Sequence, residues 1–232
     1  MHPRNTFDFS LLEPGDLVLV ANPTDPWPIR AFLFWSHVAV YVGESEDRTF
    51  VDAVNLPVRR AGRRSERGQP WQRVRYTSLR MFRSYLDVLV LRPDLPAEAR
   101  MAAAEFARAQ VGKPFPSRLG AAMLKPAQAR GPAGGRKEAP PGEFTCSSLV
   151  WHAYRRQGLD LSSGLLGGIL LPWPSLLGHD PRLAHVGRGT RYRPLRAVRG
   201  QVAHLLSRAW ARWALRADIS WRGEALPPAG PG

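Results

Sequence analysis

Runs of apolar residues predict several short strands in the first part of the chain. A turn signal over residues 13–16 precedes the continuous apolar run 17–20, which is typical of a buried strand. Residues 37–42 alternate between two kinds of side chain, and residues 49–54 repeat the strand signal after a polar loop. These two runs predict an antiparallel hairpin, and residues 85–91 predict a further strand.

Helical patterns appear later in the chain. Residues 97–111 are rich in alanine, with Asp94 as the predicted N-cap and Gly112 as the predicted stop. Residues 197–217 place apolar side chains on one helical face and arginines mostly opposite, which predicts a basic amphipathic helix.

Other stretches lack periodicity and predict loops. Residues 59–75 are basic and contain glycine, residues 126–142 are rich in proline and glycine, and prolines interrupt residues 159–194. We therefore expect an α+β domain over residues 1–195, followed by the basic helix and a disordered tail over residues 196–232.

The composition narrows the possible chemistry. The 232 residues include one cysteine, Cys146, which excludes an intrachain disulfide and a multi-thiolate zinc site, so we expect no metal and no cofactor. A formal charge of +14 favours anionic surfaces such as phospholipid or nucleic acid. Neither a signal-peptide pattern nor an apolar run of membrane-spanning length is present, so we expect a cytoplasmic protein, with peripheral membrane contact as an alternative.

Cys146 stands where a helix N-terminus is predicted, with Thr145 as its N-cap and Gly158 as its end. An ordinary thiol has a pKa of about 8.5 and is mostly protonated at neutral pH. The backbone N–H groups of a helix N-terminus and a nearby imidazolium both favour the thiolate. Cys146 is therefore the candidate nucleophile, and the alternative is an inert buried thiol.

His37 is the candidate general base because it opens a predicted strand and shares a face with Ala39 and Tyr41. Asp52 is the candidate third group that would orient the imidazole. A hairpin register that pairs His37 with Asp52, and Ala39 with Phe50, would place the carboxylate beside the ring.

The remaining histidines fit this role less well. His152 lies on the same predicted helix as the cysteine but about 240° around it. His185 follows the cysteine, but Gly187 and Gly189 beside it predict no strand. The others lie in the N-terminus, a loop and the basic helix: His2, His179 and His204.

Five short motifs occur in a fixed order over about residues 14–187. They are Gly-Asp-Leu at 15–17, Ser-His-Val-Ala-Val-Tyr-Val-Gly at 36–43, Val-Asp-Ala at 51–53, Val-Gly-Lys-Pro-Phe at 111–115 and Phe-Thr-Cys-Ser-Ser-Leu-Val at 144–150. Together they resemble the permuted NlpC-type hydrolases of the YiiX/YebB-like group within the papain-like superfamily. The resemblance implies a papain-like α+β fold, with a small antiparallel sheet packed on the helix that bears the nucleophile. It also implies a Cys–His pair with a third polar residue, usually Glu where this chain has Asp52.

Three functions remain open at this point. The first is hydrolysis of an amide in a peptide or peptidoglycan fragment, through a thioester at Cys146. The second is a lipid-directed thiol acyltransferase or esterase, as in the related lecithin:retinol acyltransferase-like enzymes, which would use residues 197–217 on an anionic membrane. The third is a non-catalytic basic binding protein, although no recognisable nucleic-acid-binding motif is present. We expect amide hydrolysis ahead of the other two.

Overall fold

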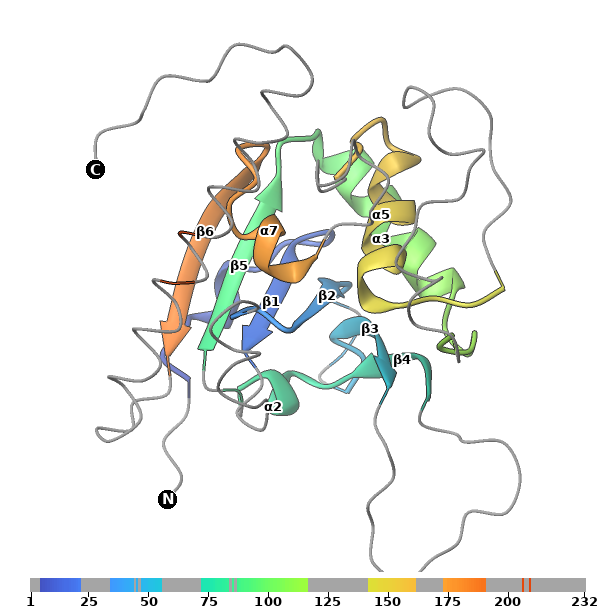
Figure 1. Ribbon diagram of the computed structural model, residues 1–232, viewed down its shortest axis with the longest axis horizontal. Helices are drawn as coiled ribbons and strands as arrows, with labels where there is room; N and C mark the ends of the chain where they lie inside the picture. The colour runs from blue at the N-terminus through green and yellow to red at the C-terminus, as the bar shows by residue number, and fades with distance from the viewer. Residues whose placement is uncertain are drawn as a thin grey trace, which may run out of the picture.

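A six-stranded antiparallel sheet forms the centre of the computed structural model, with helices packed on its faces (Figure 1). This arrangement confirms the expected α+β class. The structure describes residues 5–21, 34–43, 45, 47–55, 72–83, 85, 87–116, 142–161, 173–190, 206 and 209.

The strands lie in the order β4-β3-β2-β1-β5-β6. Their bounds are β1 Leu17–Ala21, β2 His37–Tyr41, β3 Phe50–Asn55, β4 Gln72–Thr77, β5 Asp87–Pro93 and β6 Leu183–Thr190. The helices are η1 Phe9–Leu11, α2 Leu79–Phe82, α3 Ala97–Ala109, α5 Cys146–Arg155 and α7 Pro174–Leu177. Within the described segments no helix is both long and apolar enough to cross a membrane.

Strand β1 is apolar on both faces because both faces of the sheet are covered. Leu17 and Leu19 belong to the larger core, which includes buried residues of α3 and α5. Val18 and Val20 belong to a second core on the opposite face, together with aromatic residues of η1 and α2. A central strand buried on both sides needs a continuous apolar run, which explains the pattern over residues 17–20.

Helix α3 packs beside α5 (Figure 1). Its buried face is made of alanines, whose small side chains allow the backbones of packed elements to approach closely. The predicted N-cap was wrong: Pro96 occupies that position, and the backbone N–H of Asp94 instead donates to the carbonyl of Arg182. Gly112 follows the helix with a φ of 95°, which a glycine adopts without steric cost.

Strand β6 corrects the prediction that residues 159–194 are mainly loop. The prediction that Gly187 and Gly189 exclude a strand is wrong, because both lie within β6, where the N-terminal segment crosses it. A Cβ atom at Gly187 would lie 2.9 Å from the ring of Phe7, and one at Gly189 would overlap Asn5. The side chain of Asn5 donates to the Gly189 carbonyl at 3.2 Å. Glycine is needed here for close approach of two segments, not for a turn.

Strand β4 likewise occupies part of the predicted basic loop over residues 59–75, since it begins at Gln72 and pairs with β3 along its whole length. The predicted loop over residues 126–142 lies outside the described residues, apart from Gly142. The predicted helix over residues 197–217 also lies outside them, apart from Leu206 and Ala209, which are both helical.

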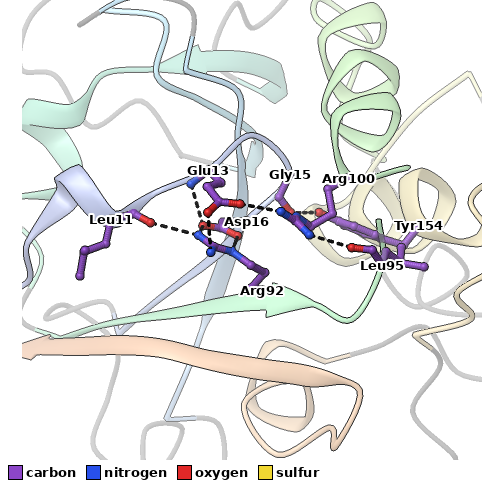
Figure 2. Close-up of polar contacts among 8 residues, drawn as sticks. All are labelled: Leu11, Glu13, Gly15, Asp16, Arg92, Leu95, Arg100 and Tyr154. Atoms are coloured by element: carbon purple, nitrogen blue, oxygen red, sulfur yellow. Dashed lines mark hydrogen bonds and ion pairs between the residues drawn. The ribbon is translucent and has the colours of Figure 1, made fainter. Parts of the chain in front are cut away.

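A buried ion pair anchors the turn before β1 (Figure 2). Asp16 is fully buried and accepts two hydrogen bonds from Arg92 of β5, at 2.9 and 2.8 Å. Glu13 bridges Arg92 and Arg100 of α3, at 2.7 and 2.5 Å. The hydroxyl of Tyr154 donates to the Gly15 carbonyl, which ties α5 to the same turn. The cluster therefore fixes α3, α5 and β5 relative to β1.

Candidate active site

Helix α5 begins at Cys146, as predicted. Thr145 is its N-cap and forms a capping box with Ser148: the Ser148 N–H donates to Thr145 Oγ1 at 3.0 Å, and the Thr145 N–H donates to Ser148 Oγ at 2.8 Å. These reciprocal bonds end the preceding loop and start the helix at a defined residue. The thiol therefore lies in the first turn, where the helix dipole favours an anion.

The imidazole of His37 lies beside the carboxylate of Asp52. His37 Nε2 is 3.0 Å from Asp52 Oδ2, and the side chains are 16% and 1% exposed. The expected register was nevertheless wrong by two residues, because β2 and β3 pair Val40 with Val51 and Tyr41 with Phe50. A shift of two residues keeps every side chain on the same face, so the two groups still meet.

Two side chains of β4 hold the other oxygen of Asp52. Thr77 Oγ1 donates to Oδ1 at 2.8 Å, and Arg75 Nε lies 3.4 Å from the same atom. Arg75 is directly opposite Asp52 in the β3–β4 register. Burial alone would raise the pKa of Asp52, but His37, Arg75 and Thr77 hold it below its usual value.

The thiol of Cys146 and the imidazole of His37 lie close enough to shift each other's pKa, since α5 packs against β2. Since Nε2 faces Asp52, the nitrogen left for the thiol is Nδ1. Burial alone would lower the pKa of His37, but the hydrogen bonds and charges of Asp52 and Cys146 outweigh it and raise the pKa to about 10. The imidazole is therefore cationic at neutral pH.

The thiol responds in the opposite direction. Burial opposes ionisation of Cys146, but the hydrogen bond and positive charge of His37 lower its pKa, and the Val38 backbone N–H and the Ser147 side chain act in the same sense. The raised pKa of His37 and the lowered pKa of Cys146 both favour a thiolate–imidazolium pair, which is the nucleophile and base arrangement that thiol chemistry requires.

Helix α7 holds the segment that leads into His37. The backbone N–H of Trp35 donates to Ser175 Oγ at 3.1 Å, and Ser175 Oγ donates to the Trp35 carbonyl at 3.2 Å. Ser175 is fully buried, so both bonds are shielded from water. The candidate base is thus positioned by a residue far from it in sequence, which no local pattern indicates.

The competing histidines lie elsewhere. His152 is buried on α5 against the rings of Phe144 and Trp151, and burial and nearby cations lower its pKa to about 4. His185 is on β6, where its Nε2 lies 3.2 Å from the Gly178 carbonyl oxygen. His179 follows α7 in a turn, and His2 and His204 lie outside the described residues.

A thiolate–imidazolium pair should have a contribution to the free energy of unfolding that does not change with pH over part of the pH range. With ordinary pKa values of 6.5 for histidine and 9.0 for cysteine, the unfolded pair carries one proton between those pH values, on sulfur. In the thiolate–imidazolium form, the folded pair also carries one proton, on His37. Its contribution to the free energy of unfolding is therefore flat there, falling below about pH 6.5 and above about pH 9.

Urea unfolding of wild type and Cys146→Ala at several pH values checks this expectation. In the variant, Cys146 no longer helps to raise the pKa of His37, but Asp52 still does, so the contribution of His37 should decline as the pH rises above about 6.5. If the free energy of unfolding changes with pH in the same way in both proteins, the thiol is protonated in the folded state.

No group of three or more histidine, cysteine or acidic side chains in the described part of the chain is arranged to hold a metal ion.

The chain was compared with protein-family models, with curated proteins and with solved structures. None of the three comparisons found a match.

Proposed function

We propose that the protein is a cysteine hydrolase that cleaves an amide bond through a thioester intermediate. One observation carries the proposal: His37 contacts the buried carboxylate of Asp52, and its imidazole lies near enough to the thiol of Cys146, at a helix start, for each group to shift the other's pKa. A thiol, a base and a group that orients the base, in contact in this order, are what nucleophilic catalysis by cysteine needs.

The proposed reaction uses these groups in two stages. The thiolate of Cys146 attacks the carbonyl carbon, an S–C bond forms, and the oxygen becomes an oxyanion near the backbone N–H groups at the start of α5. As the C–N bond breaks, the leaving nitrogen takes the proton of His37. Water then attacks the thioester and gives its proton to His37, the S–C bond breaks, and a carboxylic acid leaves.

The arrangement also supports the proposal of a permuted papain-like architecture. The base comes from β2 and its carboxylate partner from β3, and both precede the nucleophile in the chain. Helix α5 packs on one face of the antiparallel sheet, in contact with β2 and β3. These features agree with the order of motifs that carries the resemblance to the YiiX/YebB-like group.

The distribution of charge bears on the two alternative functions. The described residues include thirteen basic and twelve acidic side chains, whereas the whole chain carries +14. The excess positive charge that motivated a membrane or nucleic-acid partner is therefore in the remaining segments. The described residues therefore support a catalytic function of Cys146 and His37 better than either alternative. The proposed substrates are amides in peptides or peptidoglycan.

Alkylation of Cys146 tests the proposed nucleophile directly, because the chain has no second cysteine. Near neutral pH, iodoacetamide should modify the folded protein about tenfold faster than the same protein unfolded in urea. The gain comes from complete ionisation, and the lower nucleophilicity of a low-pKa thiolate reduces it. Intact mass spectrometry gives both rates, and an equal or slower rate in the folded protein would rule out an activated thiol.

The same mass measurement can identify the substrate class. Wild type incubated with mixed peptides and lipid esters should acquire the mass of an acyl group, and Cys146→Ala should not. An acyl group from a peptide would support amide hydrolysis, whereas a fatty acyl group would favour the lipid-directed alternative.

A further inference from the structure

Arg75 stands on the side of the Asp52 carboxylate that faces away from the imidazole. Its Nε lies 3.4 Å from Asp52 Oδ1, while His37 Nε2 lies 3.0 Å from Oδ2. The carboxylate is 1% exposed and Arg75 only 21% exposed, so water screens their interaction weakly. One buried anion therefore lies between two cationic groups, an imidazolium and a guanidinium.

The charges around the pair balance only when Arg75 is counted. The groups that face His37 are Asp52 of β3 and Cys146 of α5, and Arg75 of β4 faces Asp52. Helix α2 contacts Arg75 through an uncharged side chain, because the Sδ atom of Met81 lies 3.9 Å from a guanidinium nitrogen of Arg75. With a thiolate and an imidazolium present, the four groups sum to zero, and without Arg75 they would sum to one negative charge.

This balance matters for the first stage of the proposed reaction, in which the C–N bond breaks. His37 must first hold a proton and then release it to the leaving nitrogen, so its basicity has to be limited as well as raised. A buried carboxylate with no other partner would hold the imidazolium more tightly. A permanent positive charge behind that carboxylate weakens its hold and keeps the carboxylate ionised when the imidazole becomes neutral.

We propose that Arg75 is a positioning residue that acts through Asp52, holding this carboxylate ionised and offsetting its charge so that His37 can return its proton to the leaving group. The inference rests on the proposed function and adds a role that Cys146, His37 and Asp52 do not supply. Thr77, which bonds the same oxygen without a charge, fixes the position of the carboxylate but cannot offset it.

The test is the pH dependence of Cys146 alkylation in Arg75→Gln. A nearby positive charge lowers the pKa of both a thiol and an imidazolium, so its removal should raise both. The inflection for thiolate formation and the inflection for loss of the imidazolium proton should each move about half to one unit to higher pH. Arg75→Lys keeps the charge and should leave both inflections close to wild type.

Arg80→Gln is the matched control, because it removes an arginine that is exposed on α2. It should leave both inflections in place. If Arg75→Gln does not fold, Arg75→Met provides a second neutral variant that keeps an apolar stem against Met81 and should show the same shift. Loss of folding in both neutral variants would make Arg75 a structural residue and overturn the inference.

The direction in which the alkaline inflection of the alkylation rate moves distinguishes an electrostatic role of Arg75 from a purely structural one. If Arg75 only supports the fold, its loss would loosen Asp52, and the inflection of His37 would move to lower pH or stay in place. Either result overturns the inference while leaving the nucleophile intact. Failure of the proposed function is distinct, since wild-type Cys146 would then react no faster than the unfolded chain.

Discussion

Replacing His37 with alanine should abolish turnover and return Cys146 to the behaviour of an ordinary thiol. The imidazole is the main group that opposes the cost of burying a thiolate, through both its hydrogen bond and its charge. Without it, desolvation should leave the thiol protonated near neutral pH. We expect a fall of about 10³-fold or more in turnover, since nucleophile activation and proton transfer are lost together.

Two measurements check this expectation. Hydrolysis of an identified substrate gives the loss of turnover, and the iodoacetamide rate near neutral pH should fall about tenfold, to that of the unfolded chain. His185→Ala is the matched control, because the ring of His185 on β6 contacts the Gly178 carbonyl at the end of α7. This variant should leave both rates unchanged. If Cys146 stays reactive in His37→Ala, the start of α5 activates the thiol by itself.

The second large effect concerns stability. Asp16→Ala should lower the free energy of unfolding by about 2–4 kcal/mol, because it removes a fully buried partner of Arg92. The lower part of the range for buried pairs applies, since Arg92 is 25% exposed and keeps its contacts with Glu13 and the Leu11 carbonyl. A domain with a total stability of about 5–15 kcal/mol would lose a large share of it.

Urea denaturation monitored by circular dichroism measures this loss. Glu13→Gln serves as the comparison within the same cluster, because Glu13 is 48% exposed and surface ion pairs contribute about 0–1 kcal/mol. Equal losses in the two variants would mean that burial of Asp16 adds nothing to its pairing with Arg92.

The elements nearest the candidate site were predictable because each has a strong local cause. A continuous apolar run predicted β1, and two strand signals separated by a polar loop predicted the β2–β3 hairpin. Thr145 before Cys146 predicted the start of α5, since a capping residue acts on the backbone within its own turn. The contact between His37 and Asp52 was predicted correctly although the predicted register was wrong by two residues, because strand side chains alternate between faces with a period of two.

Other features could not be predicted because their causes are distant in sequence. Gly187 and Gly189 look like strand breakers until Asn5 and Phe7 are seen to cross them. Ser175 holds the segment before His37 from 140 residues away. Arg75 offered a partial signal, since it shares a strand face with Thr77, but the register with Asp52 requires β4 to be recognised as a strand first.

The crossing of β6 by the N-terminal segment also has a consequence for protein synthesis. Thr6 and Asn5 bind Thr190 and Gly189, so the first described residues find their partners among those made 184 positions later. The segment before His37 likewise waits for Ser175. A chain still on the ribosome therefore carries Cys146 before Ser175 has been made to hold the segment that leads into His37.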